Sequence, residues 1–234
     1  TGSVTFNTVT TNVFMGGVVG LLDKIDSDIS YSENSGPVTA SGQANGLWIA
    51  GVLGSTGWAV CDYIKNSAPI TVKNCYIKAS TWLSGCVGRF DKDSNTSSKT
   101  VTGMENTGNL TMKEGISTDD QSSWQYVGGV VGNAYASTKI ENVHVTGDVL
   151  ISGRGYIGGI AGHGYVVMDN VSVVANEGGL ITSTFWCAGG VLGYAGEGTT
   201  NITNAHVEGL TVTSAAGGLG AIVGMAEDNE GKPP

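Results

Sequence analysis

The chain has 234 residues, including 38 Gly and 4 Pro, and only 13% of its residues are charged. Disordered chains are rich in charge and poor in β-branched residues, so the abundance of Val, Ile and Thr excludes a disordered chain. The 20 acidic and 11 basic residues give a formal charge of −9, which leaves no basic surface for nucleic acid. Gly, Ser, Thr or Asn interrupts every apolar run after a few positions, so we expect no transmembrane segment.

A seven-residue pattern, here named the anchor, recurs along the chain: an aromatic residue, an aliphatic one, two small residues, two aliphatics and Gly. It occupies residues 14–20, 48–54, 82–88, 126–132, 156–162, 187–193 and 218–224, and the last two copies lack the aromatic. Counted from the second small residue (17, 51, 85, 129, 159, 190 and 221), successive copies lie 34, 34, 44, 30, 31 and 31 residues apart. A unit of this length with one insertion predicts a repeat architecture.

A second shared block lies between anchors and contains Asn followed by alternating apolar residues. Its copies are residues 72–77, 140–145, 168–173 and 202–207. Each unit therefore reads as short strands separated by Gly or Asn. Gly interrupts every candidate helix within about two turns, so we expect an all-β chain.

The constant phase of the repeat favours a β-solenoid, or β-helix, of about seven coils of roughly 31 residues. In a solenoid each residue lies about 4.8 Å above its equivalent in the preceding coil, so like residues stack on like. The alternative is a β-propeller, but propeller blades usually have about 40 or more residues. We expect one repeat domain over residues 1–234, with an inserted loop region at 89–125.

The repeat also predicts which residues form columns. We expect an inward aliphatic column of Val18, Val52, Cys86, Val130, Ile160, Val191 and Ile222. We expect Gly20, Gly54, Gly88, Gly132, Gly162, Gly193 and Gly224 at a corner, where positive φ or lack of space for a Cβ atom would require Gly. Asn74, Asn142, Asn170 and Asn204 are expected to form a partial, buried amide ladder at another corner.

One column could form a binding surface for a ligand or partner. It consists of Phe14, Trp48, Trp82, Tyr126 and Tyr156. Aromatic faces about 4.8 Å apart suit sugar rings or the apolar groups of a partner protein. The alternative is that these rings only cover one flank of the solenoid.

The remaining reactive residues form no recognisable catalytic or metal site. His144 and His206 fall about 10 Å apart if the coils stack, which is too far for one zinc ion, and His163 has no triad partner. Asp91 and Asp93 resemble the opening of a calcium loop, but Thr96 and Thr102 replace its Gly and Glu, so we expect no cofactor. Cys61, Cys75, Cys86 and Cys187 are expected to be buried thiols, with a Cys75–Cys86 disulfide as the alternative.

The anchor and the preceding Asn-Val-x-Val block resemble the GLUG repeat of bacterial cell-surface proteins, over essentially the full length of the chain. Proteins with such repeats are typically exported and adhesin-like, and some carry the repeats beside a peptidase domain. The resemblance implies an extracellular or bacterial cell-surface location. It provides no catalytic residue, because the family defines none in the repeat.

We therefore expect a non-enzymatic surface or secreted repeat module that acts in adhesion or as a structural stalk. Its partners would be a host glycan or protein, or neighbouring domains of a longer chain. Alternatives are a fimbrial or filament subunit and an accessory domain of a larger secreted peptidase. A polysaccharide lyase-type enzyme is less favoured, because the acidic residues are dispersed along the sequence.

Overall fold

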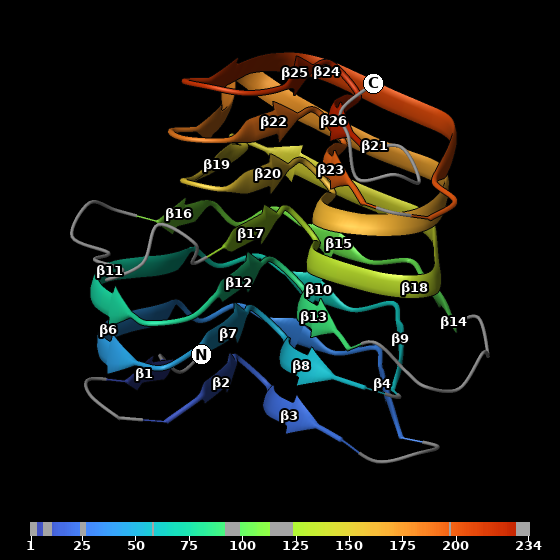
Figure 1. Ribbon diagram of the computed structural model, residues 1–234. Coiled ribbons are helices and arrows are strands. Elements are labelled where there is room, and N and C mark those ends of the chain that lie inside the picture. The colour runs from blue at the N-terminus through green and yellow to red at the C-terminus, as the bar shows by residue number, and fades with distance from the viewer. Residues whose placement is uncertain are drawn as a thin grey trace.

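The computed structural model describes residues 4–6, 11–23, 27–57, 59–91, 99–112, 124–196 and 198–227. Every regular element of that part of the chain is a β-strand, and the strands number 26. Figure 1 shows successive coils that follow one another along a single axis, from β1 to β3 at one end to β24 to β26 at the other.

In the first three coils, two short strands flank the Gly-containing bend of the anchor and further strands lead to the next anchor. In the fourth and fifth coils, the strand after the bend is long and runs for 17 and 23 residues. The first three coils comprise β1 (Val4–Phe6), β2 (Val13–Gly16), β3 (Val19–Leu22), β4 (Asp28–Ser30), β5 (Glu33–Asn34), β6 (Val38–Ala44), β7 (Leu47–Ala50), β8 (Leu53–Thr56), β9 (Val60–Asp62), β10 (Lys65–Asn66), β11 (Ile70–Ile77), β12 (Thr81–Ser84), β13 (Val87–Phe90), β14 (Lys99–Thr102), β15 (Glu105–Asn106) and β16 (Leu110–Met112). The later coils comprise β17 (Gln125–Gly128), β18 (Val131–Gly147), β19 (Leu150–Gly153), β20 (Tyr156–Gly158), β21 (Ala161–Ser183), β22 (Cys187–Gly189), β23 (Leu192–Ala195), β24 (Asn201–Ser214), β25 (Leu219–Gly220) and β26 (Val223–Ala226).

The strands of each coil pair in parallel with the equivalent strands of the next. The first strands of the seven anchors form one sheet in the order β2-β7-β12-β17-β20-β22-β25. Their register aligns Trp48 with Trp82 and Trp82 with Tyr126, so the aromatic positions coincide from coil to coil. Parallel stacking of consecutive repeats confirms the predicted solenoid and does not fit the separate blades of a propeller.

The inward aliphatic column is confirmed in the five inner coils. Val52, Cys86, Val130, Ile160 and Val191 are all fully buried in one continuous core. At the ends, Val18 is 46% exposed and Ile222 is partly buried. Each end coil has a neighbour on one side only, so its inward side chains remain partly open to solvent.

The glycine column does not lie at a corner, contrary to expectation. Its members lie within the second strand of each anchor, and none has positive φ. A Cβ atom on Gly88 would lie 2.3 Å from the carbonyl oxygen of Gly54 in the adjacent coil. Close approach of neighbouring coils is therefore the reason for Gly at these positions.

The expected asparagine ladder is only partly correct. Asn142, Asn170 and Asn204 share a corner with φ of 53°, 53° and 49°, and Asn170 Nδ2 donates to Asn142 Oδ1 at 2.7 Å. These side chains are exposed rather than buried, and Asn204 donates to Asp169 instead of to Asn170. Asn74 lies elsewhere, at an irregularity in the pairing of β11 with β6.

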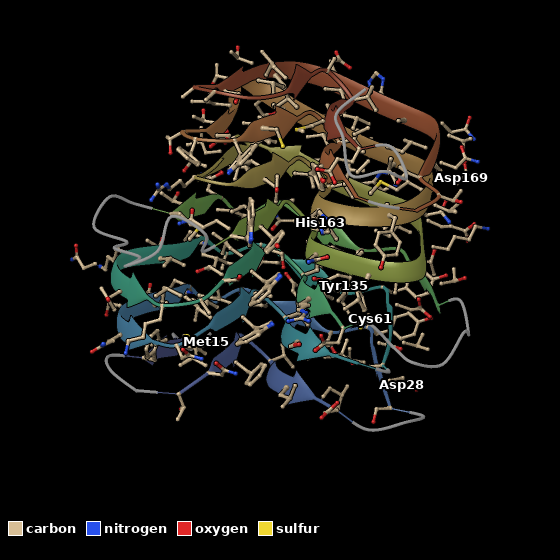
Figure 2. The ribbon with its side chains drawn as sticks, viewed as in Figure 1. Met15, Asp28, Cys61, Tyr135, His163 and Asp169 are labelled. Atoms are coloured by element: carbon tan, nitrogen blue, oxygen red, sulfur yellow. The ribbon has the colours of Figure 1, made fainter. Side chains whose placement is uncertain are left out.

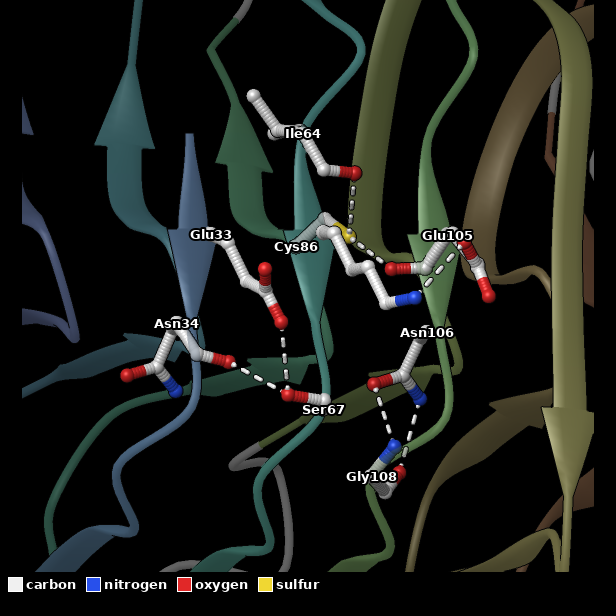
Figure 3. A network of polar contacts seen from close by, with 9 residues as sticks. Glu33, Asn34, Ile64, Ser67, Cys86, Glu105, Asn106 and Gly108 are labelled. Carbon is white, nitrogen blue, oxygen red and sulfur yellow. Dashed lines mark hydrogen bonds and ion pairs between the residues drawn. The ribbon is translucent and has the colours of Figure 1, made fainter. Parts of the chain in front are cut away.

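A buried amide ladder does exist, but it consists of Asn34, Asn66 and Asn106. Asn34 Nδ2 donates to Asn66 Oδ1 at 2.8 Å, and Asn66 Nδ2 donates to Asn106 Oδ1 at 2.7 Å. The ladder also binds the turn that follows each member, because Asn106 accepts from Gly108 N and donates to its carbonyl. Figure 3 shows the two outer asparagines on either side of Ser67.

The ladder ends where the residue in its column changes from Asn to Val. Asn106 aligns with Val145, which is followed in the later coils by Val173 and Val207. The same column faces the second small residue of the anchors. A Cβ atom on Gly51 would lie 2.2 Å from Asn66 Oδ1, and one on Gly159 would lie 2.8 Å from Val173 Cγ2. In the inner coils, the second small residue of the anchor must therefore be Gly whether the side chain opposite it is Asn or Val.

Within the expected inserted region 89–125, the structure places three strands that continue the stack. β14 pairs with β18, β15 with β10 and β18, and β16 with β11 and β19. Residues 99–112, in the middle of the expected insertion, are therefore a regular part of the stack. Residues 92–98 and 113–123 of the expected insertion lie outside the described residues.

We predict that Asn66→Ala destabilises the fold strongly. The substitution leaves the buried Asn34 amide without its acceptor and removes a donor from Asn106 Oδ1, and a stranded buried group costs about 1–3 kcal/mol. Urea denaturation measures the effect as a lower midpoint. The control is Asn176→Ala, which removes one exposed bond to Asp148. Equal midpoints for the two variants would contradict a stabilising role for the ladder.

Candidate binding face

The five aromatic residues expected to share a column do so, and their rings stack along the solenoid axis. Successive ring centroids, from Phe14 through Trp48, Trp82 and Tyr126 to Tyr156, are 4.6, 4.5, 5.6 and 5.6 Å apart. The first three pairs are nearly parallel, with interplanar angles of 24°, 14° and 9°. In-register pairing of the strands that carry these residues sets this spacing.

The rings of the inner coils are mostly buried. Trp48 and Trp82 are 8% and 7% exposed, and Tyr126 and Tyr156 are 9% and 8% exposed. Because each ring covers the face of its neighbour, the faces stabilise one another. A ligand on this column would meet ring edges.

A second column, on the strand after the bend, packs against the aromatic column. It consists of Leu21, Ser55, Arg89, Asn133, His163, Tyr194 and Met225. Tyr194 stacks on Tyr156 at 4.5 Å, in the coil where Cys187 replaces the anchor aromatic. The Arg89 guanidinium lies 4.7 Å from the centroid of Trp82. The two columns together form one face, here named the binding face.

Several polar atoms of the binding face are buried without a hydrogen-bond partner. They are Trp48 Nε1, Trp82 Nε1, Arg89 Nε, Asn133 Nδ2 and Ser55 Oγ. The four nitrogens can only donate, so the interior of this face is rich in donors. The charge of Arg89 is balanced by an ion pair from Nη2 to Asp91.

His163 lies among the rings of the binding face. Its ring packs at 5.1 Å on Tyr194 and at 5.3 Å from Tyr126, and its Nδ1 lies 3.2 Å from Asn133 Oδ1. Loss of hydration among these side chains lowers the pKa of His163 from 6.5 to about 4. The imidazole is therefore neutral at pH 7. Figure 2 labels His163 near Tyr135, whose ring it approaches edge-on.

A more exposed group of side chains, missed by the sequence analysis, continues from Tyr156. We name Trp124, Arg154, Phe185 and Trp186 the aromatic patch. Trp124 stacks on Tyr156 at 5.3 Å and lies 5.7 Å from Trp186. Trp124 and Trp186 are partly buried, and Phe185 is 36% exposed. The available sequence signal was their position one or two residues before an anchor.

The other histidines share one column, as expected; His206 is exposed and His144 is partly buried. His144 and His206 are separated by Ser172 in the intervening coil. His144 Nδ1 lies 2.8 Å from Ser172 Oγ, whereas His206 Nε2 lies 3.0 Å from Glu208 Oε2. The two imidazoles thus have different partners.

All four cysteines are buried, as expected, and Cys75 and Cys86 are not joined by the alternative disulfide. Burial raises the pKa of Cys75 to about 11 and that of Cys187 to about 12. Cys86 and Cys61 belong to the same core as Cys75. Burial also raises the pKa of Cys86, so the thiols of Cys75, Cys86 and Cys187 are protonated at neutral pH and poorly nucleophilic.

Of the two aspartates that resemble the opening of a calcium loop, Asp91 pairs with Arg89, and Asp93 lies outside the described residues. Over the described ranges, no three His, Cys, Asp or Glu side chains gather closely enough to hold a metal ion. The same ranges contain no helix long and apolar enough to cross a membrane.

We predict that His163 makes stability depend on pH. Its folded pKa lies below the unfolded value of 6.5, so the unfolded state binds the proton more readily. The contribution of His163 to the free energy of unfolding should fall by about 2–3 kcal/mol between roughly pH 6.5 and pH 4 and change little below pH 4. Urea midpoints over this range should decline less in His163→Gln than in the original protein. The assignment to His163 would be wrong if the control His206→Gln lessened the decline of the midpoint as much as His163→Gln does. It would also be wrong if His163→Gln left the decline unchanged.

Comparison with known proteins gives two matches. The GLUG motif matches residues 125–150 and 186–213, each of which contains one anchor and the strand that follows it. Halomucin of Haloquadratum walsbyi is 27% identical over 172 residues, which cover 73% of this chain and 2% of halomucin. The chain thus corresponds to a small part of the length of this curated relative. No solved structure matches the chain.

Proposed function

We propose that this chain, a repeat protein that carries GLUG motifs, is a module of an extracellular or cell-surface protein and acts there as a structural stalk and in adhesion. The observation that carries the proposal is the parallel stacking of its coils, whose equivalent strands pair in register apart from local bulges. The GLUG matches and the similarity to a short part of halomucin support a repeat protein of this kind.

A solenoid is suited to a stalk because each coil contacts only its neighbours. Each added coil lengthens the rod by about 4.8 Å and presents the same columns again. The length of the rod and the number of presented sites therefore increase together with the number of repeats.

The charged groups support a non-enzymatic role, because the ion pairs of the described residues are spread over different coils instead of converging on one point. Glu105 binds Lys65 at 3.2 Å, and Asp169 accepts bonds from Thr203 and Asn204. Glycosidase-type cleavage would need two carboxyl groups facing each other about 5–10 Å apart across a bound sugar. A lyase-type enzyme remains the less favoured alternative.

The partner in this proposal is a host glycan or protein, or a neighbouring domain of a longer chain. We assign the contact to the side that carries Phe14, Trp48, Trp82, Tyr126 and Tyr156. Because their faces are covered by one another, a partner would contact the ring edges and the adjoining aromatic patch. Rings held rigidly by stacking lose little conformational entropy on binding.

The surface role predicts that an antibody against the folded chain labels intact cells that produce it. Flow cytometry should detect the label before lysis, and mild external protease should remove it while a cytosolic control protein stays intact. Deletion of the repeats should reduce attachment to host glycan or host cells. Labelling only after lysis would overturn the location, and labelled cells with unchanged attachment would leave the stalk without the adhesive role.

A filament subunit is the second candidate, favoured by apolar side chains that are exposed in the first and last coils of the described residues. Leu219 is 57% exposed, although its equivalents in the inner coils, such as Ile49 and Leu83, are fully buried. Val18 is exposed at the opposite end. Two different exposed ends could join head to tail, which generates an open filament instead of a closed dimer.

This candidate predicts that sedimentation velocity shows species that grow with concentration. Leu219→Lys should abolish them by placing a charge at the joint, whereas the control Leu180→Lys, on a flank position that is 37% exposed, should not. A strict monomer at high concentration would contradict the filament and leave the stalk unaffected.

A further inference from the structure

The aromatic patch combines rings from successive coils with one arginine. Trp124 precedes β17, Arg154 follows β19, and Phe185 and Trp186 precede β22. Phe185 packs edge-on against Trp186, with centroids 6.0 Å apart and planes at 85°. Their partial exposure distinguishes these rings from the buried anchor aromatics.

The backbone under the patch is held by bonds between coils. Arg154 N donates to Gln125 Oε1 at 2.9 Å, and its carbonyl accepts from Trp186 N at 3.3 Å. Trp186 N also donates to Ser183 Oγ at 3.1 Å, and the Trp124 carbonyl accepts from Thr81 N at 2.9 Å. The patch is thus preorganised by the stack, which reduces the entropy lost on binding.

Arg154 differs from the other arginine of the described chain. Arg89 is paired with Asp91, and the same type of pair links Lys139 to Glu141. The Arg154 guanidinium lies 4.7 Å from the centroid of Phe185, and no carboxylate pairs with it among the described residues. A guanidinium offers a planar fork of donors that matches a carboxylate.

We propose that the aromatic patch binds a carboxylated sugar residue, such as a uronic acid at the end or on a branch of a glycan. The carboxylate would bind the Arg154 fork, and the apolar face of the sugar ring would pack on the indole rings. Trp124 and Trp186 would each supply an Nε1–H donor for sugar hydroxyls. This inference rests on the proposed adhesive function and specifies its ligand.

The positive charge of Arg154 favours an acidic sugar over a neutral one, although the chain as a whole is acidic. The chain carries a formal charge of −9, and after Lys139 its basic residues are Arg154 and Lys232 only. Distant carboxylates repel an acidic glycan weakly, since charges are screened beyond about 8 Å at physiological ionic strength. Discrimination between the acidic and the neutral sugar therefore depends on the Arg154 guanidinium beside the rings.

The test titrates the full chain with methyl glucuronide and, as its uncharged counterpart, methyl glucoside. Indole N–H signals in ¹H–¹⁵N NMR spectra report binding, and Trp124→Phe and Trp186→Phe assign the two signals while retaining an aromatic ring. We expect the glucuronide to shift both signals and to bind about tenfold more tightly than the glucoside. Equal affinities, or shifts confined to other tryptophans, would overturn the proposal.

Arg154→Gln should reduce the affinity for the glucuronide about tenfold to that for the glucoside, with Arg154→Lys intermediate. The matched control Lys139→Gln removes one positive charge from a different position and should leave binding unchanged. Unchanged thermal melting of Arg154→Gln shows that loss of binding is not loss of fold. Equally tight binding of a Glu-rich peptide at the patch would contradict a sugar ligand.

Failure of this inference can be separated from failure of the proposed function. If intact cells are labelled and attach to host glycan but the isolated chain ignores the glucuronide, the patch ligand is wrong and the surface role stands. If the glucuronide binds as expected but the chain is found only inside cells, the surface role is wrong.

Discussion

The structure depends on one constraint, the spacing of about 4.8 Å between parallel strands of successive coils. At this spacing, whatever occupies a position in one coil must pack on its equivalent in the next. Gly88 illustrates the steric side of the constraint, because a Cβ atom there would collide with the Gly54 carbonyl. The Asn34, Asn66 and Asn106 ladder illustrates the polar side, because each buried amide is satisfied by the next.

The same spacing determines what the surface can offer. Aromatic residues in one column stack so closely that Trp48 and Trp82 retain little exposed area. Rings become accessible where they leave the column, as Trp124 and Trp186 do before their anchors. Regular stacking therefore provides rigidity, and departures from the repeat provide places for a partner. This arrangement suits a module in which the scaffold is the same in every coil and the contacts with a partner are confined to a few positions.

The anchor made the solenoid predictable from the sequence, because stacked coils place the same residue type at the same phase of every unit. The buried amide ladder was not predicted, because it has only three members. Its column changes from Asn to Val at Val145, so the sequence shows no residue that is repeated in every coil at this position. The sequence predicted a corner at Asn142, Asn170 and Asn204, but it did not predict the left-handed backbone that the structure shows there. Tyr31 and Tyr63 occupy left-handed conformations in earlier coils. Backbone geometry is maintained along this column while residue identity is not.

The residues that line the candidate binding face were predicted in part for the same reason. Its aromatic column shares the phase of the anchor, whereas Arg89, His163 and Tyr194 form a column whose chemistry changes in every coil. Equivalent positions can be recognised there only after the register is known. The low pKa of His163 follows from the packing of rings around it, which no local sequence pattern encodes.

The most direct test of in-register stacking measures distances along one column. Thr39, Thr71, Thr111, Ser152, Thr182 and Thr213 align from coil to coil. Nitroxide labels introduced at pairs of these positions through unnatural amino acids, with the four cysteines untouched, can be measured by double electron–electron resonance. Thr39 to Thr182 should give about 19 Å and Thr39 to Thr213 about 24 Å, a step of about 4.8 Å per coil. Distances that do not increase by a constant step would contradict the stacked solenoid.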